Sequence, residues 1–472
     1  MLRCRIRASV AWQWKSPHAL FTSLFVRYHS SAKDILAAQA PQNQAHIKYV
    51  WINGVEALER YQSGGYHPIM IGDILHRRYH IVDKLGFGGY ATLWLARDIQ
   101  LSRYVVVKIN VADSSLRETT ILRKISAQDP PFSTTAKYSG GRDLITVLLD
   151  EFKINGPNGA HQCYTMTPAR CNLRDASYSR LFPIDVARAI SASLALAVAF
   201  LHTRGYIHGD IHLRNVLATL PFSFDELSIE EFYEKYGKPE TVSITRCDGG
   251  SLPLSIPTKA VLPLSLEKTA WDFTLADAQV LLGDFGEAFA AAEPRYGVDC
   301  HTPLSMRAPE ARFEPHRPLT YAADIWSLGV AIWELIGMKA IFSSEFITED
   351  EMISQRIDIL GPMPSEWWDK WEERDQFFDP CQYPKDGRYV WPAIEEAFQE
   401  GVQKYRQLKP YMGVFDKDEK AAVLDLIRRM LMFRPGQRLT VEEVMETEWM
   451  VKWALPAFER AKLASSSRTC SA

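Results

Sequence analysis

Cysteine is scarce in this chain, and its spacing argues against two kinds of architecture. Only seven of the 472 residues are cysteines, and no two of them form a Cys-x-x-Cys pair. This pattern disfavours a disulfide framework or a zinc site and fits a reducing compartment. The net charge is also small, −3 with histidine neutral, so the bulk charge indicates neither direct nucleic-acid binding nor membrane binding. We expect neither partner.

Long hydrophobic runs are missing as well. The longest lies near Leu194 to Leu201, well short of the ~20 residues that a helix needs to span a bilayer. We therefore predict a soluble protein. Apolar residues make up 47% and charged residues 24% of the chain, a balance that excludes a disordered or fibrous chain and allows a sizeable core.

The first 33 residues are rich in Arg and contain no Asp or Glu. Apolar residues from Leu20 to Phe25 cluster on what would be one face of a helix. This combination is typical of mitochondrial presequences, and a disordered start is the alternative. On either interpretation residues 1–44 stand apart, and we expect the folded chain to begin near residue 45.

Segments rich in β-branched and aromatic residues come early in the chain, and helical segments come later. Strands are predicted over residues 79–82, 92–96, 104–109 and 144–152. Helices are predicted over residues 115–125, 187–202, 325–336 and 421–432. Pro and Ser crowd residues 219–265, which predicts an inserted, partly flexible segment.

A glycine-rich turn lies between two of the predicted strands. Glycines let the backbone approach a polyanion and point N–H groups at phosphates, although a plain hairpin turn has the same composition. The turn comprises Leu85, Gly86, Phe87, Gly88, Gly89 and Tyr90. Lys108 follows in an apolar strand, where a charge is costly unless it is paired. Its natural partners are a phosphate and a carboxylate on the next helix, for which Glu118 is best placed.

Two further motifs supply carboxylates and an amide. Asp210 and Asn215 stand five residues apart in one loop and can converge on one site. Asp210 can there accept a hydroxyl proton while Asn215 holds a metal ion. Asp284 adds a second carboxylate beside glycines. A phosphate cradle, a lysine, two metal ligands and a base are the parts that phosphoryl transfer needs.

In this order the motifs resemble the eukaryotic protein-kinase family, as do Ala308-Pro309-Glu310 and Arg438 further on. The resemblance implies an α+β, bilobal fold with a small antiparallel β-sheet N-lobe, one main helix in it, and a larger, mainly helical C-lobe. It also implies the division of the chain: an extension at 45–78, the N-lobe at 79–166, the C-lobe at 167–455 with insertions at about 219–279 and 340–415, and a tail at 456–472.

The resemblance implies ATP and Mg²⁺ as cofactors. By analogy, Lys108 orients the α- and β-phosphates and pairs with the helix carboxylate, and Asp210 is the catalytic base. Asn215 and Asp284 would be the Mg²⁺ ligands. Met166 at the hinge and His212 would complete the nucleotide site.

Two structural contacts are implied in the same way. Glu310 should form a salt bridge with Arg438, and Asp324 should brace the catalytic loop from below.

Within the family, the chain resembles the CMGC group and its fungal SR-protein kinases. The segment Tyr61–Asp73, the 69 positions from Asn215 to Asp284, and the stretch Ile359–Pro364 carry this resemblance. It implies a monomeric enzyme with protein substrates that are basic and arginine–serine-rich, such as splicing factors. Residues 345–400 hold fifteen acidic and five basic residues, a net −10. This charge favours basic peptides, or it is simply a solvated acidic face.

Three departures from the family pattern stand out. Gly209 replaces an Arg that usually answers a phosphorylated activation loop, so we expect activation without such phosphorylation. His212 replaces a phosphate-binding Lys and is a weaker partner for the γ-phosphate. Residues 301–306 do not align cleanly with the family's peptide-positioning loop.

The predicted function is that of a non-specific serine/threonine protein kinase. A pseudokinase scaffold that binds ATP without turnover is one alternative, suggested by His212 and Leu213-Arg214. A small-molecule phosphotransferase is another, since His208-Gly209-Asp210 resembles the loop of aminoglycoside-type enzymes. The start of the chain indicates mitochondria, whereas the family resemblance indicates cytoplasm and nucleus.

Overall fold

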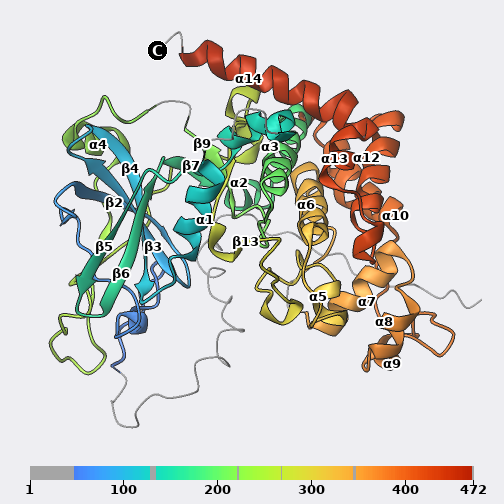
Figure 1. Cartoon of the computed structure of the whole chain (residues 1–472), viewed down its shortest axis with the longest axis horizontal. Helices are drawn as coiled ribbons and strands as arrows, with labels where there is room; N and C mark the ends of the chain where they lie inside the picture. Colours follow the sequence, from blue (N-terminus) through green and yellow to red (C-terminus); the bar gives the residue numbers. More distant parts are fainter. Residues whose placement is uncertain (1–46, 128–133, 221–222, 267, 344–346, 470–472) are drawn as a thin grey trace, which may run out of the picture.

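A mainly β-sheet lobe and a mainly helical lobe make up the molecule, as Figure 1 shows for the computed structural model of the chain. The structure describes residues 47–127, 134–220, 223–266, 268–343 and 347–469. The presequence predicted within residues 1–44 therefore lies outside the described residues. The α+β, bilobal architecture expected from the sequence is confirmed.

The N-lobe is built on a six-stranded antiparallel sheet in the order β1-β2-β3-β4-β6-β5. Its one main helix is α1 (Arg117–Ser126). In the register of the sheet, Lys108 on β4 stands opposite Leu93 on β3 and Tyr164 on β6, which places the lysine in the interior of the sheet. The strands are β1 (Ile74–Leu75), β2 (Tyr79–Phe87), β3 (Ala91–Asp98), β4 (Arg103–Ala112), β5 (Asp150–Gly156) and β6 (Gly159–Met166).

One predicted strand is misplaced. The run over residues 144–152 becomes a strand only at Asp150, where β5 begins. Leu144 and Ile145 are buried in the main apolar core instead, and Ile145 makes a single parallel bridge to Leu282. Their apolar side chains are used for packing, so tertiary burial has overridden a local β propensity.

Three long helices form the framework of the C-lobe, each within a few residues of its predicted position. They are α3 (Ile184–Thr203), α6 (Tyr321–Ile336) and α12 (Lys417–Met430). The apolar run Leu194 to Leu201 lies within α3, and the whole helix is long and apolar enough by composition to cross a membrane, although most of it is buried in the lobe. Ser191 and Ser193 interrupt the run, but their hydroxyls donate to carbonyls four residues earlier, at 2.8 and 2.9 Å.

Short elements connect these helices and carry the site. The strands are β7 (Ala169–Asn172), β8 (Tyr206–Ile207), β9 (Val216–Thr219), β12 (Val280–Leu282) and β13 (Phe289–Ala290). The helices are α2 (Leu173–Ser177), α5 (Glu310–Phe313), α7 (Glu349–Leu360), α8 (Ser365–Lys370), α9 (Arg374–Phe377), α10 (Ile394–Phe398), α11 (Lys404–Gln407), α13 (Val441–Glu446) and α14 (Leu455–Thr469).

The insertion is folded onto the N-lobe, which corrects the expectation of a partly flexible segment. It contains α4 (Ile229–Tyr236) and a hairpin of β10 (Thr241–Ser243) with β11 (Lys259–Val261). A capping box at Ser228 starts the helix. Phe232 then packs among aromatic and apolar residues of β2, β3 and β4, so a few aromatic anchors outweigh the Pro- and Ser-rich composition.

The two ends of the described chain are also packed. The N-terminal extension forms an apolar cluster with the insertion, in which Tyr61 and Tyr66 meet Ile244. The segment predicted as a C-terminal tail is for the most part α14, which lies across α3 (Figure 1). Its Ala457 and Ala461 are fully buried, so this segment is part of the C-lobe.

Candidate active site

Lys108 is buried at the centre of a charged cluster between the lobes. Its Nζ lies 2.8 and 3.0 Å from the carboxylate oxygens of Glu118 on α1, and 3.1 Å from Oδ1 of Asp284. Burial alone would lower the pKa of Lys108. The charges of Glu118 and Asp284 outweigh burial and raise that pKa well above its usual value. The structure therefore brings the predicted pair together and keeps the amine charged.

Tyr164 is a site residue that the sequence analysis missed. Its hydroxyl donates to Oε1 of Glu118 at 2.8 Å, and the Nζ of Lys108 lies 5.6 Å from the centroid of its ring. Burial raises the pKa of Tyr164 well above its usual value, so the hydroxyl remains a donor. No motif marks this tyrosine, and its place opposite Lys108 follows only from the register of β4 against β6.

Asp324 holds the loop between β8 and β9 from below. Its carboxylate accepts the backbone N–H groups of His208 and Gly209 at 2.8 and 2.9 Å, and Nε2 of His202 lies 3.0 Å away. Burial opposes the charge on this carboxyl, but the bond to His202 and the other polar contacts keep the pKa of Asp324 below its usual value. This is the bracing contact that the family resemblance implied.

Asp210 and Asn215 lie against each other in this loop. The Nδ2 of Asn215 donates to the carbonyl oxygen and to Oδ2 of Asp210, at 2.9 and 3.1 Å. Nε2 of His212 lies 3.3 Å from the same Oδ2. The other oxygen, Oδ1, is buried and has no hydrogen-bond partner among the described residues. The carboxylate of Asp210 therefore keeps acceptor capacity that no described residue uses.

Strand β12 leads Asp284 to the same place. It pairs with β9, and the N–H of Gly283 donates to the carbonyl of Asn215 at 2.8 Å. Asp284 has a left-handed backbone, with φ of 56°, a conformation that is uncommon for residues other than glycine. The charge of Lys108 lowers the pKa of Asp284 although burial acts against it. Lys108, Asp210, Asn215 and Asp284 thus share one site.

The glycine-rich turn is the hairpin between β2 and β3. The N–H of Gly88 donates to the carbonyl of Ala91 at 2.9 Å and closes the turn. The side chains of Phe87 and Tyr90 are exposed. Met166 is the last residue of β6, next to the crossing into the C-lobe where the hinge was predicted. The predicted cradle residues that complete this hairpin are Leu85, Gly86 and Gly89.

Gly209 has a structural reason to replace the usual Arg. Its φ is +74°, and a Cβ there would lie 3.1 Å from the carbonyl oxygen of Glu287, so a side chain would be strained. Direct contacts hold the segment after Asp284 in place. Arg295 forms an ion pair with Glu287, and the hydroxyl of Thr302 donates to the carbonyl of Gly209 at 2.5 Å. None of these contacts needs a phosphate group.

Residues 301–306 have a defined structure although they did not align with the family pattern. The Nη2 of Arg356 donates to the carbonyls of Leu304 and Arg307 at 2.9 and 2.7 Å, and the hydroxyl of Ser327 donates to Met306 at 2.9 Å. Burial, followed by the charge of Arg307, lowers the pKa of Arg356 to about 9. The segment is therefore fixed from beneath by buried polar side chains.

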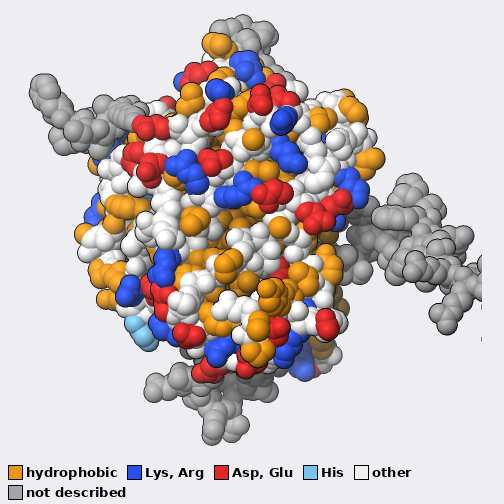
Figure 2. All heavy atoms as spheres, turned by 90° about the vertical axis from the view of Figure 1, so that its right-hand side faces the viewer, with side chains coloured by type: hydrophobic (Ala, Val, Ile, Leu, Met, Phe, Trp, Pro, Cys, Tyr) orange, Lys and Arg blue, Asp and Glu red, His pale blue; other side chains and the backbone are white. Residues whose placement is uncertain are grey.

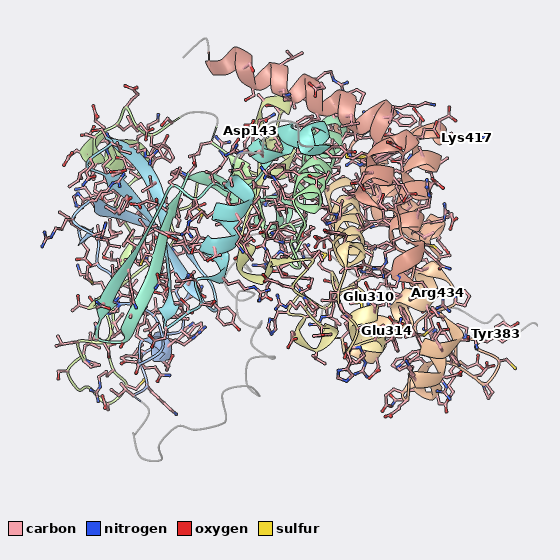
Figure 3. The ribbon with its side chains drawn as sticks, in the orientation of Figure 1. Asp143, Glu310, Glu314, Tyr383, Lys417 and Arg434 are labelled. Carbon is pink, nitrogen blue, oxygen red and sulfur yellow. The ribbon has the colours of Figure 1, made fainter. Side chains whose placement is uncertain are left out.

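Glu310 on α5 forms the buried pair with Arg438 that the resemblance implied. The two guanidinium nitrogens lie 2.7 and 2.6 Å from the two carboxylate oxygens. Figure 3 labels Glu310 on α5, Glu314 just after the end of this helix, and Arg434 to their right in the view. The pair ties α5 to the chain that follows α12, at the base of the segment over residues 301–306.

The acidic segment over residues 345–400 is partly neutralised by its surroundings. Figure 2 shows acidic and basic side chains interspersed on this side of the C-lobe. Five basic residues from outside the segment pair with its carboxylates, which offsets half of its net charge of −10. These residues are Arg307, Arg312, Lys404, Arg428 and Arg434. The electrostatic attraction of this segment for basic peptides is therefore weaker than its composition alone indicated.

The donor set fits a nucleoside triphosphate with a divalent cation. Lys108 provides a fixed positive charge beside the glycine-rich hairpin. Asp284 and Asn215 provide a carboxylate and an amide oxygen, and Mg²⁺ is commonly held by one or two such oxygens together with phosphates. The carboxylate of Asp210 lies against Asn215, where an acceptor hydroxyl would need it.

Comparisons with known proteins agree with this geometry. The protein kinase domain family matches residues 273–450. A serine/threonine protein kinase of Aspergillus fumigatus is 26% identical over 408 residues, which cover 84% of this chain and 90% of that protein. The serine/threonine-protein kinase SRPK of Physarum polycephalum is 26% identical over 425 residues, covering 84% and 91%. Human SRSF protein kinase 3 is 33% identical over 167 residues, covering 33% and 28%.

The chain thus has a protein-kinase fold, matches the protein kinase domain family over residues 273–450, and is similar to serine/threonine protein kinases. Within that class it resembles the SRPK kinases. A protein kinase domain implies ATP, a divalent metal and protein substrates.

Proposed function

We propose that this kinase transfers the γ-phosphoryl group of Mg²⁺-bound ATP to Ser or Thr in basic, arginine–serine-rich proteins. The observation that carries the proposal is the buried Lys108, which contacts Glu118 and Asp284 at once. Kinase turnover requires this lysine pair and the metal-binding aspartate to be in place together. An arrangement with all of these parts supports turnover and not ATP binding alone.

Each site residue has a task in the proposed reaction. The carboxylate of Asp210 accepts the hydrogen bond of the substrate hydroxyl and takes its proton as the oxygen–phosphorus bond forms. Lys108 orients the phosphates of the nucleotide, whose β–γ bond breaks to release ADP. Asn215 and Asp284 hold the metal, which when bound offsets the negative charge of the phosphates. His212 lies beside Oδ2 of Asp210 and supports the orientation of the base.

Two observations support the class of substrate. The Physarum and human relatives carry the names SRPK and SRSF protein kinase. The residual negative charge of the segment over residues 345–400 attracts basic peptides and raises their rate of encounter.

The test is phosphate transfer from labelled ATP with Mg²⁺ to an arginine–serine repeat peptide and to an acidic Ser peptide. Asp210→Asn should lower kcat by about 10²–10⁴-fold, the usual contribution of a general base, while nucleotide binding persists. Asp284→Asn should remove almost all turnover. Asp418→Asn, at an exposed carboxylate on α12 outside the acidic segment, is the control and should keep the wild-type rate. Equal rates on both peptides would refute the substrate class, and wild-type turnover in Asp284→Asn would refute the metal site.

A further inference from the structure

Tyr66 joins the N-terminal extension to the glycine-rich turn. Its hydroxyl donates to the carbonyl oxygen of Gly88 at 2.7 Å, across 22 positions of the chain. Gly88 lies between β2 and β3, in the part of the hairpin that points N–H groups toward phosphates in the proposed function. A side chain from outside the sheet therefore holds the backbone of this turn.

Tyr66 is itself fixed by several bonds. The N–H of Tyr66 donates to the carbonyl of Arg60 at 3.0 Å, and the carbonyl of Tyr66 accepts from Nδ2 of Asn158 at 2.6 Å. The tight turn before it demands glycine, since a Cβ on Gly65 would lie 1.8 Å from the Arg60 carbonyl oxygen. Tyr66 is 3% exposed, and burial raises the pKa of Tyr66 to about 12. Its hydroxyl thus stays protonated at neutral pH.

Arg60 sets the direction of that hydroxyl. Its Nη1 donates to the oxygen of Tyr66 at 3.1 Å, and its guanidinium lies 4.8 Å from the centroid of the same ring. Because the oxygen already accepts from Arg60, its single proton is directed to the carbonyl of Gly88. The bonds from Arg60 to Tyr66 and from Tyr66 to Gly88 thus connect the extension to the turn.

A buried ion pair anchors the same extension to β2. Lys84 pairs with Glu56, and the carboxylate of Glu56 also accepts the hydroxyl of Tyr61. The side chains of Lys84 and Glu56 are 1% and 4% exposed. The carbonyl of Lys84 accepts the N–H of Leu264 from the insertion at 2.7 Å. Extension and insertion therefore meet two residues before Gly86, where β2 enters the turn.

We propose that Tyr66 is a positioning residue for ATP. Its bond to Gly88 holds the glycine-rich turn in the position in which the N–H groups of the turn contact the phosphates. This inference rests on the proposed kinase function. A glycine-rich hairpin is mobile, and a nucleotide that has to order the turn loses affinity. If Tyr66 already orders the turn before the nucleotide binds, the phosphates bind without this loss of affinity.

The experiment compares Tyr66→Phe with Tyr61→Phe in the full chain. The rings of the two tyrosines lie 5.5 Å apart, and both are buried in the extension. Tyr61→Phe loses the bond to Glu56, whereas Tyr66→Phe loses the bond to Gly88 and the one from Arg60. Only the bond of Tyr66 reaches the turn. From the net value of one neutral hydrogen bond, Tyr66→Phe should raise KM for ATP and Kd for ADP about three- to tenfold. We expect kcat to stay within about twofold, and Tyr61→Phe to leave both constants unchanged.

A second variant and a binding assay keep the outcomes separate. Arg60→Met leaves both tyrosines in place and should raise KM for ATP in the same direction by a smaller factor. Equal shifts in Tyr66→Phe and Tyr61→Phe, or unchanged affinity for ADP in Tyr66→Phe, would overturn the inference. A wild-type chain that binds ADP but transfers no phosphate would refute the proposed function, and the ratio of ADP affinities would still decide the role of Tyr66.

Discussion

The buried basic side chains of this protein are compensated in different ways. Lys108 and Arg438 each face a carboxylate, and both pairs connect separate elements of the fold. Arg356 instead donates to two backbone carbonyls and lies over the ring of Trp326, 5.1 Å from its centroid. Removing one partner of a buried ion pair leaves an uncompensated charge, which is strongly destabilising. The carboxylate-bound residues are therefore the ones that tolerate least change.

Asp83 is a buried carboxylate for which desolvation dominates. It lies on β2, is 2% exposed, and accepts the backbone N–H of Lys84 at 2.7 Å. Burial raises the pKa of Asp83 to about 6, whereas an Asp in an unfolded chain titrates near about 3.9. The folded state thus holds this proton more tightly, and the stability that the protonated form contributes is lost as pH rises from about 4 through 6.

Asp83→Asn should remove this pH dependence. As pH rises from 4.5 to 7.5, the unfolding free energy of the variant should increase relative to that of the wild type by about 2 kcal/mol. This follows from the difference of about two units between the folded and unfolded pKa of Asp83. Urea unfolding of both proteins at the two pH values measures this difference. The other titrating groups are the same in both proteins, so their contributions cancel in the difference between the two unfolding free energies. A difference in unfolding free energy that is the same at both pH values would contradict the prediction.

At the scale of elements, α4 belongs to the C-lobe by sequence and to the N-lobe by contact. Phe232 is fully buried and stacks on the ring of Tyr104 in β4, with centroids 5.4 Å apart. The loop before the helix adds a bond from the Tyr104 N–H to Oδ1 of Asp225 at 2.6 Å. The hydroxyl of Tyr233 donates to the carbonyl of Val82 at 2.8 Å. The helix therefore covers one face of the N-lobe sheet.

Phe232→Ala should uncover that face. Loss of a buried Phe costs about 3–5 kcal/mol because it leaves a cavity among well-packed neighbours. Urea unfolding measures the loss, and hydrogen exchange at the Tyr104 amide should become faster. Leu254→Ala, in the same insertion but at a side chain that is 91% exposed, should change neither quantity. Slow exchange at Tyr104 in the Phe232 variant would show that the sheet does not depend on α4.

Features with a local signal could be predicted from the sequence. The order of the motifs was enough to expect that Lys108 pairs with Glu118, and the helices α3, α6 and α12 were predicted to within a few residues of their positions. Tyr66 and Tyr164 were missed because their partners lie 22 and 46 positions away and no spacing rule connects them. The fold of the insertion was missed for the same reason, since its aromatic anchors have meaning only against a sheet formed 120 or more residues earlier.

At the scale of the whole molecule, α14 closes the helical lobe. Figure 1 shows it across α3, and an ion pair of 3.1 Å joins Arg460 to Asp185 at the start of α3. Phe458 and the two buried alanines of α14 are part of the main apolar core. Since α3 is long and apolar over most of its length, its cover decides whether that surface meets water.

Ala461→Glu should detach this cover. Ala461 is fully buried in α14, so the variant inserts extra atoms and an unpaired charge into the core, at a cost of about 3 kcal/mol or more. Leu463→Glu places the same charge two residues along the same helix, where the native side chain is 73% exposed, and it should leave the unfolding free energy nearly unchanged. Thermal unfolding compares the two variants, and size-exclusion chromatography should show self-association only for Ala461→Glu, because an uncovered α3 exposes apolar surface. If both variants unfold at the wild-type temperature and elute alike, α14 does not close the lobe, and the core around α3 must be complete without it.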